Sequence, residues 1–273
     1  MDLLAALADL VLPSACAGCA AERVPLHFGA CEECVSALMA LEPFPAAPLP
    51  SPPGMPLCTA VGAYAGPLRG TLLAYKERGR HRLARPLGGL LAGSVAAAAL
   101  RGGGSPGKPL VIVPVPSTAS AARARHGDHM ARLAGHTVRQ LRENGWQAAL
   151  YQPLRALPRP DSASLDAPGR AKAAENSLTI RPARIRVLRR RLAMKGTLIL
   201  VDDIVTTGAT LAAVTTRLTE ANMQVAGAAT LAATRLRRAG PDAAAGVRRM
   251  SRPGSKVVGA VPPTRGDSRA SAR

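Results

Sequence analysis

The sequence predicts an α/β fold built on a mainly parallel sheet. Short apolar segments alternate with stretches in which apolar residues recur every three or four positions, the spacing of amphipathic helices. Residues 197–201 (TLILV) carry no charge, which indicates a central strand buried on both faces. Two acids and a glycine-containing loop follow that strand, and open α/β sheets bind ligands at the carboxyl ends of their strands. The sequence therefore predicts a ligand site at this edge of the sheet.

The elements follow from the same periodicities. Strands are expected at residues 58–64, 109–116, 151–155, 197–201 and 225–233, and helices at 68–76, 84–100, 127–144 and 209–221. Residues 158–172 contain Pro, Asp, Ser and Gly without periodicity and are expected to form a loop. Residues 102–108 match GxxxxGK, but Pro109 follows and the segment leads from a helix into a strand, so we interpret it as a linker.

Four segments are predicted along the chain. Residues 1–41 hold a short amphipathic helix and four cysteines, residues 42–56 a stiff proline-rich linker, residues 57–234 the α/β domain, and residues 235–273 a basic disordered tail. The first segment has Asp2 where a signal peptide has positive charge. No apolar run of 18 residues occurs, so we expect no membrane span and a cytoplasmic location.

The charge of the chain is strongly positive and unevenly placed. Of the formal net charge of +19, residues 235–273 contribute +8, with nine Arg, one Lys and two Asp. A second cluster, residues 181–191, contains RPARIRVLRRR and is expected to be a solvated face. Aromatic residues make up only 2%, which provides no stacking platform for single-stranded nucleic acid. A nucleic-acid surface and a general Arg/Ala bias of composition both stay open.

The residues after the buried strand have the chemistry of a ribose-5-phosphate site. Asp202 and Asp203 are adjacent acids that can accept hydrogen bonds from ribose hydroxyls and can hold water on a divalent cation. A loop of small residues then leads into a helix, whose first amides and positive dipole end favour a phosphate. The loop is formed by Thr206, Thr207, Gly208, Ala209 and Thr210. Nucleotide-hydrolysing folds and response regulators also carry paired acids after a strand, but not this loop.

Residues 198–211, LILVDDIVTTGATL, resemble the phosphoribosyl pyrophosphate (PRPP) motif of type I phosphoribosyltransferases. The resemblance implies that family's α/β fold, with Asp202 and Asp203 as the catalytic acids at the ribose and the loop amides on the 5′-phosphate. It also implies attack by a nitrogen acceptor on the anomeric carbon, with loss of magnesium-bound pyrophosphate. Positioning and charge stabilisation would then supply most of the acceleration.

Four of the five cysteines form two CxxC pairs. Cys16 and Cys19 are separated by eleven residues from Cys31 and Cys34, a spacing that predicts a zinc ribbon with one structural Zn²⁺. Two disulfides and a redox dithiol are the alternatives. Cys58 stands apart and is expected in the core.

A four-cysteine ribbon followed by this motif resembles the ComF family of competence-associated phosphoribosyltransferase-like proteins. Residues 64–69 (YAGPLR) with Tyr75, Lys76 and Gly79, and residues 113–116 (VPVP) with 123–129 (RARHGDH), resemble conserved stretches of that family. The resemblance implies a role with the DNA-uptake machinery. It also implies a pyrophosphate-binding loop after VPVP, which points to Ser117, Thr118, Arg123 and Arg125.

The sequence departs from the family pattern at two places. His126 separates Arg125 from Gly127, where the family has Arg-Gly, and Arg170 is followed by Asn only at Asn176. Arg159, Arg170 and Lys172 are either cations for the pyrophosphate or ordinary surface charges. His126 and His129 are interpreted as exposed or phosphate-contacting side chains, with proton transfer as the alternative. Two hypotheses result: a magnesium-dependent phosphoribosyltransferase, and a non-catalytic protein that binds PRPP or a nucleotide.

Overall fold

The computed structural model describes residues 15–125, 127–157 and 177–234. The chain divides into two units, Met1–Ala239 and Gly240–Arg273, and the described residues all belong to the first. The expected N-terminal helix, His126, the whole loop at 158–172 with its three cations, Asn176 and the basic tail lie outside the described residues.

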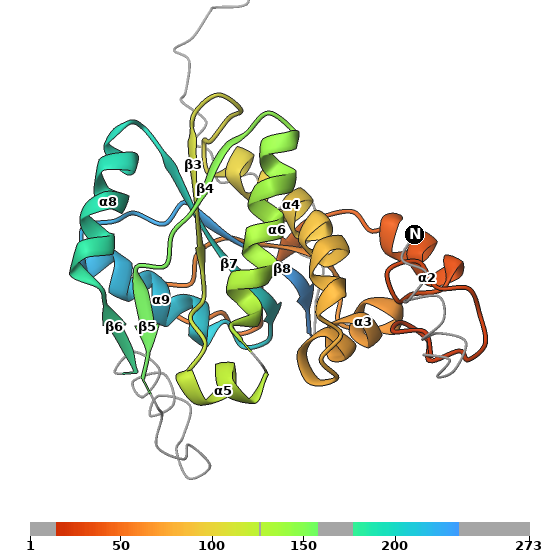
Figure 1. The fold of residues 1–273 in the computed structure, drawn as a ribbon. Helices are drawn as coiled ribbons and strands as arrows, with labels where there is room; N and C mark the ends of the chain where they lie inside the picture. Colours follow the sequence, from red (N-terminus) through yellow and green to blue (C-terminus); the bar gives the residue numbers. More distant parts are fainter. Residues whose placement is uncertain (1–14, 126, 158–176, 235–273) are drawn as a thin grey trace, which may run out of the picture. The chain divides into compact units, whose positions relative to one another are not determined.

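A six-stranded sheet forms the centre of the first unit, with the strand order β1-β2-β8-β7-β3-β4 (Figure 1). Five strands are parallel and β1 pairs with β2 in the antiparallel direction. The strands are β1 (Phe44–Ala46), β2 (Cys58–Ala63), β3 (Pro109–Pro114), β4 (Gln147–Leu150), β7 (Thr197–Val205) and β8 (Gly227–Ala233). The predicted mainly parallel sheet is confirmed.

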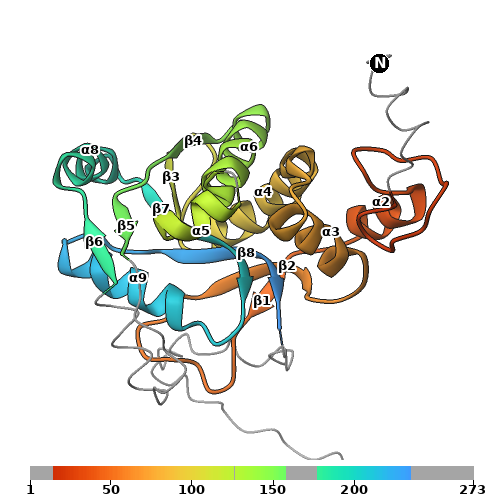
Figure 2. The same cartoon turned by 60° about the horizontal axis from the view of Figure 1, so that its bottom comes forward.

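Helices cover both faces of the sheet (Figure 2). One face packs against α3 (Gly66–Glu77), α4 (Ala84–Arg101) and α6 (His129–Glu143), and the other against α8 (Pro182–Ala193) and α9 (Ala209–Glu220). Alternate residues of β7 separate the two cores: Ile199 and Val201 belong to the first, and Leu198 and Leu200 to the second. This alternation also sends neighbouring residues at the end of β7 to opposite faces.

One described helical stretch, His81–Arg101, is long and apolar enough to cross a membrane by length and composition alone. It comprises a short 3-10 turn, His81–Leu83, and α4. Leu87, Leu91 and Val95 are buried between the sheet and α6, and 56% of the most apolar window is buried inside the protein. A core helix passes the same test, and α4 occupies a core position.

Several short elements were not predicted, since each has few residues to establish a period. They are α2 (Glu32–Met39), α5 (Ala119–Ala124), β1, β4 and β6 (Leu178–Ile180). The expected strand at 151–155 is found as β5 (Leu154–Ala156), which pairs with β6 in a separate antiparallel sheet. The arginine cluster at 181–191 forms α8, whose Ile185 and Leu188 are buried, so this segment is more than a solvated face.

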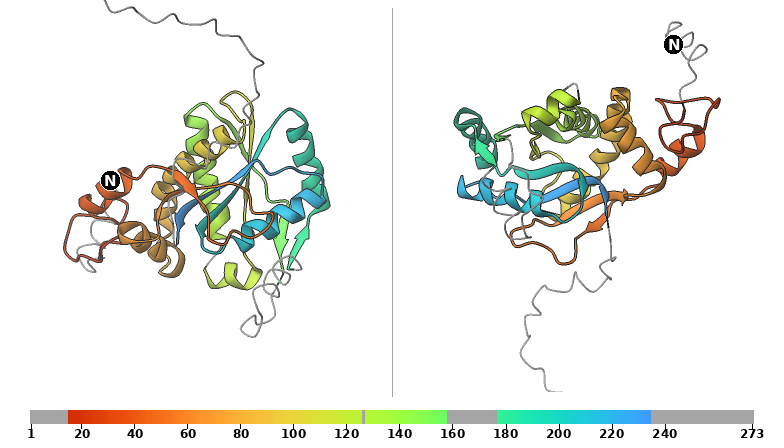
Figure 3. Two further views of the ribbon diagram at one scale, coloured as in Figure 1. Left: turned by 180° about the vertical axis from the view of Figure 1, so that it is seen from behind. Right: turned by 90° about the horizontal axis from the view of Figure 1, so that it is seen from below.

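The two N-terminal segments are packed into the same unit as the sheet. Phe44–Ala46, within the expected linker, adds β1 to the sheet edge. The cysteine segment, coloured red in Figure 3, lies beside α3, and its Ala17 and Leu38 join the buried cluster that contains Leu68 and Leu72. These contacts make the cysteine segment continuous with the main core.

Candidate functional site at the carboxyl end of β7

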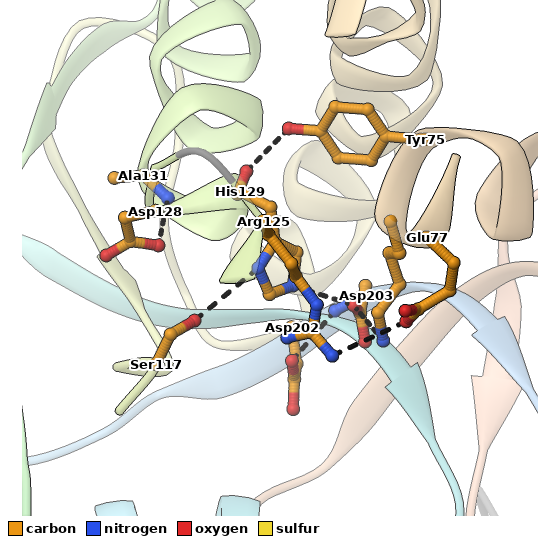
Figure 4. A network of polar contacts seen from close by, with 10 residues as sticks. Tyr75, Glu77, Ser117, Arg125, Asp128, His129, Ala131, Asp202 and Asp203 are labelled. Carbon is orange, nitrogen blue, oxygen red and sulfur yellow. Dashed lines mark hydrogen bonds and ion pairs between the residues drawn. The ribbon is translucent and has the colours of Figure 1, made fainter. Parts of the chain in front are cut away.

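The acidic pair lies near the end of β7, in register with β8, where Asp202 pairs with Thr230. Asp203 is buried at 5% exposure and faces α3 and α6, whereas Asp202 is partly exposed and faces the opposite side of the strand. Figure 4 shows the two carboxyl groups with their surroundings. The two acids are neighbours in sequence but occupy different environments.

Two nitrogen atoms meet one oxygen of Asp203. Lys76 Nζ lies 2.7 Å from Asp203 Oδ2, and His129 Nε2 lies 3.1 Å from the same atom. Burial by itself raises the pKa of Asp203, but the hydrogen bond from His129 and the charge of Lys76 hold that pKa below its usual value. Asp203 is therefore a fixed, ionised carboxylate.

Asp202 has the opposite electrostatics. Burial and the adjacent charge of Asp203 raise the pKa of Asp202 to about 8. Its Oδ1 accepts a hydrogen bond from the amide of Asp203 at 2.9 Å. The surroundings of Asp202 thus favour the protonated carboxyl, whereas a bound cation or a donor hydroxyl would favour its ionised form.

The loop after β7 turns tightly into α9. Gly208 has φ +75° and immediately precedes the helix, which begins at Ala209. Gly208 has no side chain and therefore gives the helix no side-chain cap. The first amide of α9, that of Ala209, instead donates to Thr207 Oγ1 at 3.4 Å. The N-terminus of a helix favours an anion. Thr206 and Thr207 are exposed, and Ala209 and Thr210 are partly exposed. All five residues expected to bind the 5′-phosphate therefore lie on one turn, next to the acidic pair.

Two residues of the expected linker pack on this turn. A Cβ at Gly208 would meet Met55 Sδ and Pro48 Cγ. The left-handed backbone therefore favours glycine at 208. A side chain there would also displace the flexible end of Met55 and contact Pro48.

The second loop of the site follows β3, the strand that pairs with β7. The amide of Val115 donates to Val201 O at 2.9 Å, which brings the end of β3 beside the acidic pair. Ser117 Oγ lies 3.5 Å from His129 Nδ1, and Thr118 caps α5 by accepting a hydrogen bond from Ala121 N at 3.2 Å. Ser117 is therefore linked to Asp203 through His129, whereas Thr118 contacts residues of α5 and pairs with Ala156.

The two arginines of this loop lie on or just after α5. Arg123 is exposed, and Arg125 forms an ion pair with Glu77 at 3.4 Å. Figure 4 draws Arg125 with its partner Glu77, which follows Lys76, the residue that pairs with Asp203. A cavity of about 250 Å³ borders the same loop, lined in part by Ser117, Asp128, Arg155 and Arg181.

Two side chains of the site were not assigned from the sequence. His129 was expected to be exposed or to contact phosphate, but it is buried because its ring lies between Asp203 and Ser117. Lys76 lies in a segment that resembles the ComF family, but the sequence gives it no role in the site. Its ion pair with Asp203 joins residues 127 positions apart in the chain. In the sequence, Tyr75 and Lys76 stand at the end of an expected amphipathic helix. That position does not show which distant residue would pair with Lys76.

The four cysteines form a separate cluster that fits a metal. The sulfur atoms of Cys16, Cys19, Cys31 and Cys34 all lie within 4.8 Å of one another. A tetrahedral Zn²⁺ with Zn–S bonds of about 2.3 Å requires sulfur separations of roughly 3.8 Å, and the Sγ atoms of Cys19 and Cys31 are 3.7 Å apart.

The surroundings of Cys16 favour the thiolate that a metal needs. The amides of Gly18 and Cys31 donate to Cys16 Sγ at 3.3 and 3.2 Å. Although burial raises it, hydrogen bonds from backbone amides lower the pKa of Cys16 to about 6. The residues present therefore fit a structural zinc ion. Cys58 is buried in the main core, as expected.

Comparison with known proteins points to the same region. No curated protein sequence matches the chain. A model of the phosphoribosyl transferase domain matches residues 168–260, which include β7, the acidic pair, the loop and α9. Over these residues the chain is similar to the phosphoribosyl transferase domain, carried on a mainly parallel α/β sheet with a cysteine cluster that could hold zinc.

Proposed function

We propose that the chain binds PRPP together with Mg²⁺ and transfers its phosphoribosyl group to a nitrogen acceptor. One observation carries the proposal: a single strand–loop–helix places Asp202 and Asp203 beside the turn at Gly208 that opens α9. Carboxylates suited to ribose hydroxyls then adjoin amides suited to a phosphate. The similarity of residues 168–260 to the phosphoribosyl transferase domain supports this assignment.

The site residues would act by orientation and charge. The loop from Thr206 to Thr210 anchors the 5′-phosphate, and the two acids hold the ribose hydroxyls, which fixes the anomeric carbon relative to the acceptor. Asp203 and the ionised form of Asp202 stabilise the positive charge that develops on the sugar as its bond to pyrophosphate breaks. Magnesium, when bound with the ligand, supplies positive charge to the departing pyrophosphate.

Ser117, Thr118, Arg123 and Arg125 are the donors that we assign to the pyrophosphate. Ser117 and Thr118 stand on the loop after β3, beside β7. The pyrophosphate leaves with the electron pair of its bond to the anomeric carbon, while the acceptor nitrogen supplies the pair for the new bond. We assign the domain to residues 57–234, with the cysteine ribbon (1–41) and linker (42–56) before it and the basic tail (235–273) after it.

A second function is favoured by the state of Arg125. Arg125 is paired with Glu77, so this arginine is already partly neutralised and is less available to bind the pyrophosphate. A protein that binds PRPP or a nucleotide without turnover, and that assists DNA uptake or nucleic-acid metabolism as the resemblance to the ComF family implies, fits this feature. A cytoplasmic location accords with either function.

Calorimetry and a pyrophosphate assay distinguish the two functions. Both predict that PRPP with Mg²⁺ binds and raises the melting temperature, by mass action on the folded state. Only the transferase predicts pyrophosphate release when a pool of purine and pyrimidine bases, amines and ammonia is added. Binding without release for every acceptor would select the second function. Failure of PRPP to bind would refute the transferase and would leave only a nucleotide as the ligand of the second function.

The role of the acidic pair is tested by the double variant Asp202→Asn with Asp203→Asn. It keeps side-chain size but removes both negative charges, so we expect it to fold and to lose PRPP binding. Retained binding in this variant would show that the acidic pair is not the ribose site.

A further inference from the structure

Three consecutive side chains at the end of α3 contact three separate parts of the site. Tyr75 Oη donates a hydrogen bond to the carbonyl oxygen of His129 at 2.7 Å, at the start of α6. Lys76 Nζ pairs with Asp203 on β7 at 2.7 Å, and Glu77 pairs with Arg125, just after α5, at 3.4 Å. Figure 4 shows Tyr75, Glu77 and their partners around the acidic pair. The last turn of α3 therefore organises the acids, the histidine and the pyrophosphate loop together.

The first half of α3 lies against the cysteine knuckle, which we define as residues 16–34. A Cβ at Gly70 would collide with the carbonyl oxygen of Gly18 and lie 2.8 Å from that of Ala17. A Cβ at Gly18 would lie 2.6 Å from Cys34 Sγ and 3.4 Å from Cβ of Pro67. Gly70 thus allows α3 to approach the knuckle backbone more closely than any other residue would permit, whereas Gly18 leaves room for Cys34 within the knuckle itself.

The contact between α3 and the knuckle extends into the core. Ala17 of the knuckle and Leu38 of α2 share one buried cluster with Leu68, Leu72 and Tyr75 of α3. Beyond the helix, Arg80 Nη1 lies 3.4 Å from the carbonyl oxygen of Gly29. The knuckle therefore supports both α3 and the residues that follow it.

A helix of twelve residues is about 18 Å long and moves as a rigid body. We propose that α3 transmits the position of the cysteine knuckle to the acidic pair, so that Lys76 is a positioning residue whose place depends on the Gly70–Gly18 contact. A shift of α3 on the knuckle moves Tyr75, Lys76 and Glu77 together. The effect on PRPP rests on the proposed function, whereas the effect on the Lys76–Asp203 ion pair does not.

Gly70→Ala tests the proposal because two effects of the change oppose each other. Alanine is more favourable than glycine in a helix interior, so a role in helix stability alone predicts a neutral or stabilising change. The collision with Gly18 predicts displacement of α3. Gly135→Ala on α6 is the matched control, since its Cβ would meet no atom within 4 Å.

Two readouts are measured on the full-length protein. The first is the rate at which an amine reagent modifies Lys76, followed by peptide mass spectrometry, and we expect Gly70→Ala to raise it severalfold. The second is the affinity for PRPP with Mg²⁺ by calorimetry. A displacement of about 1 Å at a site can cost up to roughly a hundredfold, and we expect Gly70→Ala to lose at least about tenfold. Gly135→Ala should leave both readouts at the wild-type value.

The remaining outcomes also decide the question. A folded Gly70→Ala protein with unchanged Lys76 modification and unchanged affinity would overturn the proposal. If the wild-type protein binds no PRPP, the proposed function fails, and the modification rate alone decides the coupling. If Gly70→Ala does not fold, Leu38→Ala, which loosens the packing between α2 and α3 without a clash, takes its place in both measurements.

Lys76 itself is tested by charge. Lys76→Met removes the cation that faces Asp203, and Lys76→Arg keeps it. We expect Lys76→Met to weaken PRPP binding and Lys76→Arg to restore a large part of it. Equal affinities in the two variants would show that the charge does not position Asp203.

Discussion

At the scale of single residues, the two acids differ because a strand sends neighbours to opposite faces. Asp203 meets Lys76 and His129, which stabilise its charge, whereas burial and the charge of Asp203 raise the pKa of Asp202 to about 8. The surroundings therefore favour the ionised form of Asp203 and the protonated form of Asp202. A polyol that binds together with a cation suits such a pair, because an ionised carboxylate can accept hydrogen bonds from its hydroxyls and a protonated carboxyl can donate one.

The raised pKa of Asp202 makes stability depend on pH in the absence of ligand. Between the unfolded value near 4 and the folded value of about 8, the folded state binds a proton that the unfolded state has released. Stability from this group is therefore full below pH 4 and is lost as the pH rises through 8. The Asp202→Asn protein cannot lose a proton at this position, so it escapes this loss of stability at high pH. Its melting temperature should therefore exceed that of the wild type by more at pH 8.5 than at pH 5.

Asp203→Asn provides the contrast. The folded pKa of Asp203 is depressed, so its contribution is present above the unfolded value and is lost as the pH falls through the folded value. We expect Asp203→Asn to lower the melting temperature at pH 7, because Lys76 loses its partner. Thermal melts of Asp202→Asn and Asp203→Asn at several pH values test these opposite pKa shifts. If the melting temperatures of both variants changed in the same direction relative to the wild type, the shifts would be contradicted.

At the scale of elements, the turn between β7 and α9 depends on one glycine. Gly208→Ala forces a left-handed backbone on alanine and drives its methyl group into Met55. We expect loss of PRPP binding together with a destabilisation of at least about 1 kcal/mol. Gly107→Ala is the control, because Gly107 has φ +86° but open space around its Cβ position. It should lose stability without losing affinity, as measured by thermal melts and calorimetry.

The elements also show where periodicity is informative. Helices α4, α6 and α9 were predicted within two residues at each end, since each spans at least three turns. Helix α8 was hidden because its five arginines obscured the spacing of Ile185 and Leu188, which are the only buried residues of α8. Strand β4 has four residues at a sheet edge, too few to establish an alternation.

At the scale of the whole molecule, the cysteine knuckle is part of the core that supports the site. We expect the purified protein to contain about one zinc ion per chain and a chelator to lower its melting temperature. Cys34→Ala should lose the metal, whereas Cys58→Ala, a buried cysteine outside the cluster, should keep it. Less than about one zinc per two chains, by elemental analysis after purification without chelators, would argue against the zinc assignment.

Truncation tests the predicted tail. A chain that ends at Thr234 retains every described helix and strand, through the end of β8. We expect it to keep its melting temperature within about 2 °C, a change of less than roughly 1 kcal/mol, and to keep its affinity for PRPP. Because the similarity to the phosphoribosyl transferase domain extends to residue 260, a loss of affinity would place residues after 234 in the functional unit.

The sequence by itself determined the sheet class, the strand–loop–helix around Asp202 and Asp203, and the four cysteines. Each of these is local: an apolar run, a short motif or a fixed spacing carries the whole signal within about 20 residues. Only the tertiary structure decided which acid is ionised, that His129 is buried, and that α3 joins the knuckle to the site. These features arise from contacts between residues far apart in the chain, and no local pattern encodes such contacts.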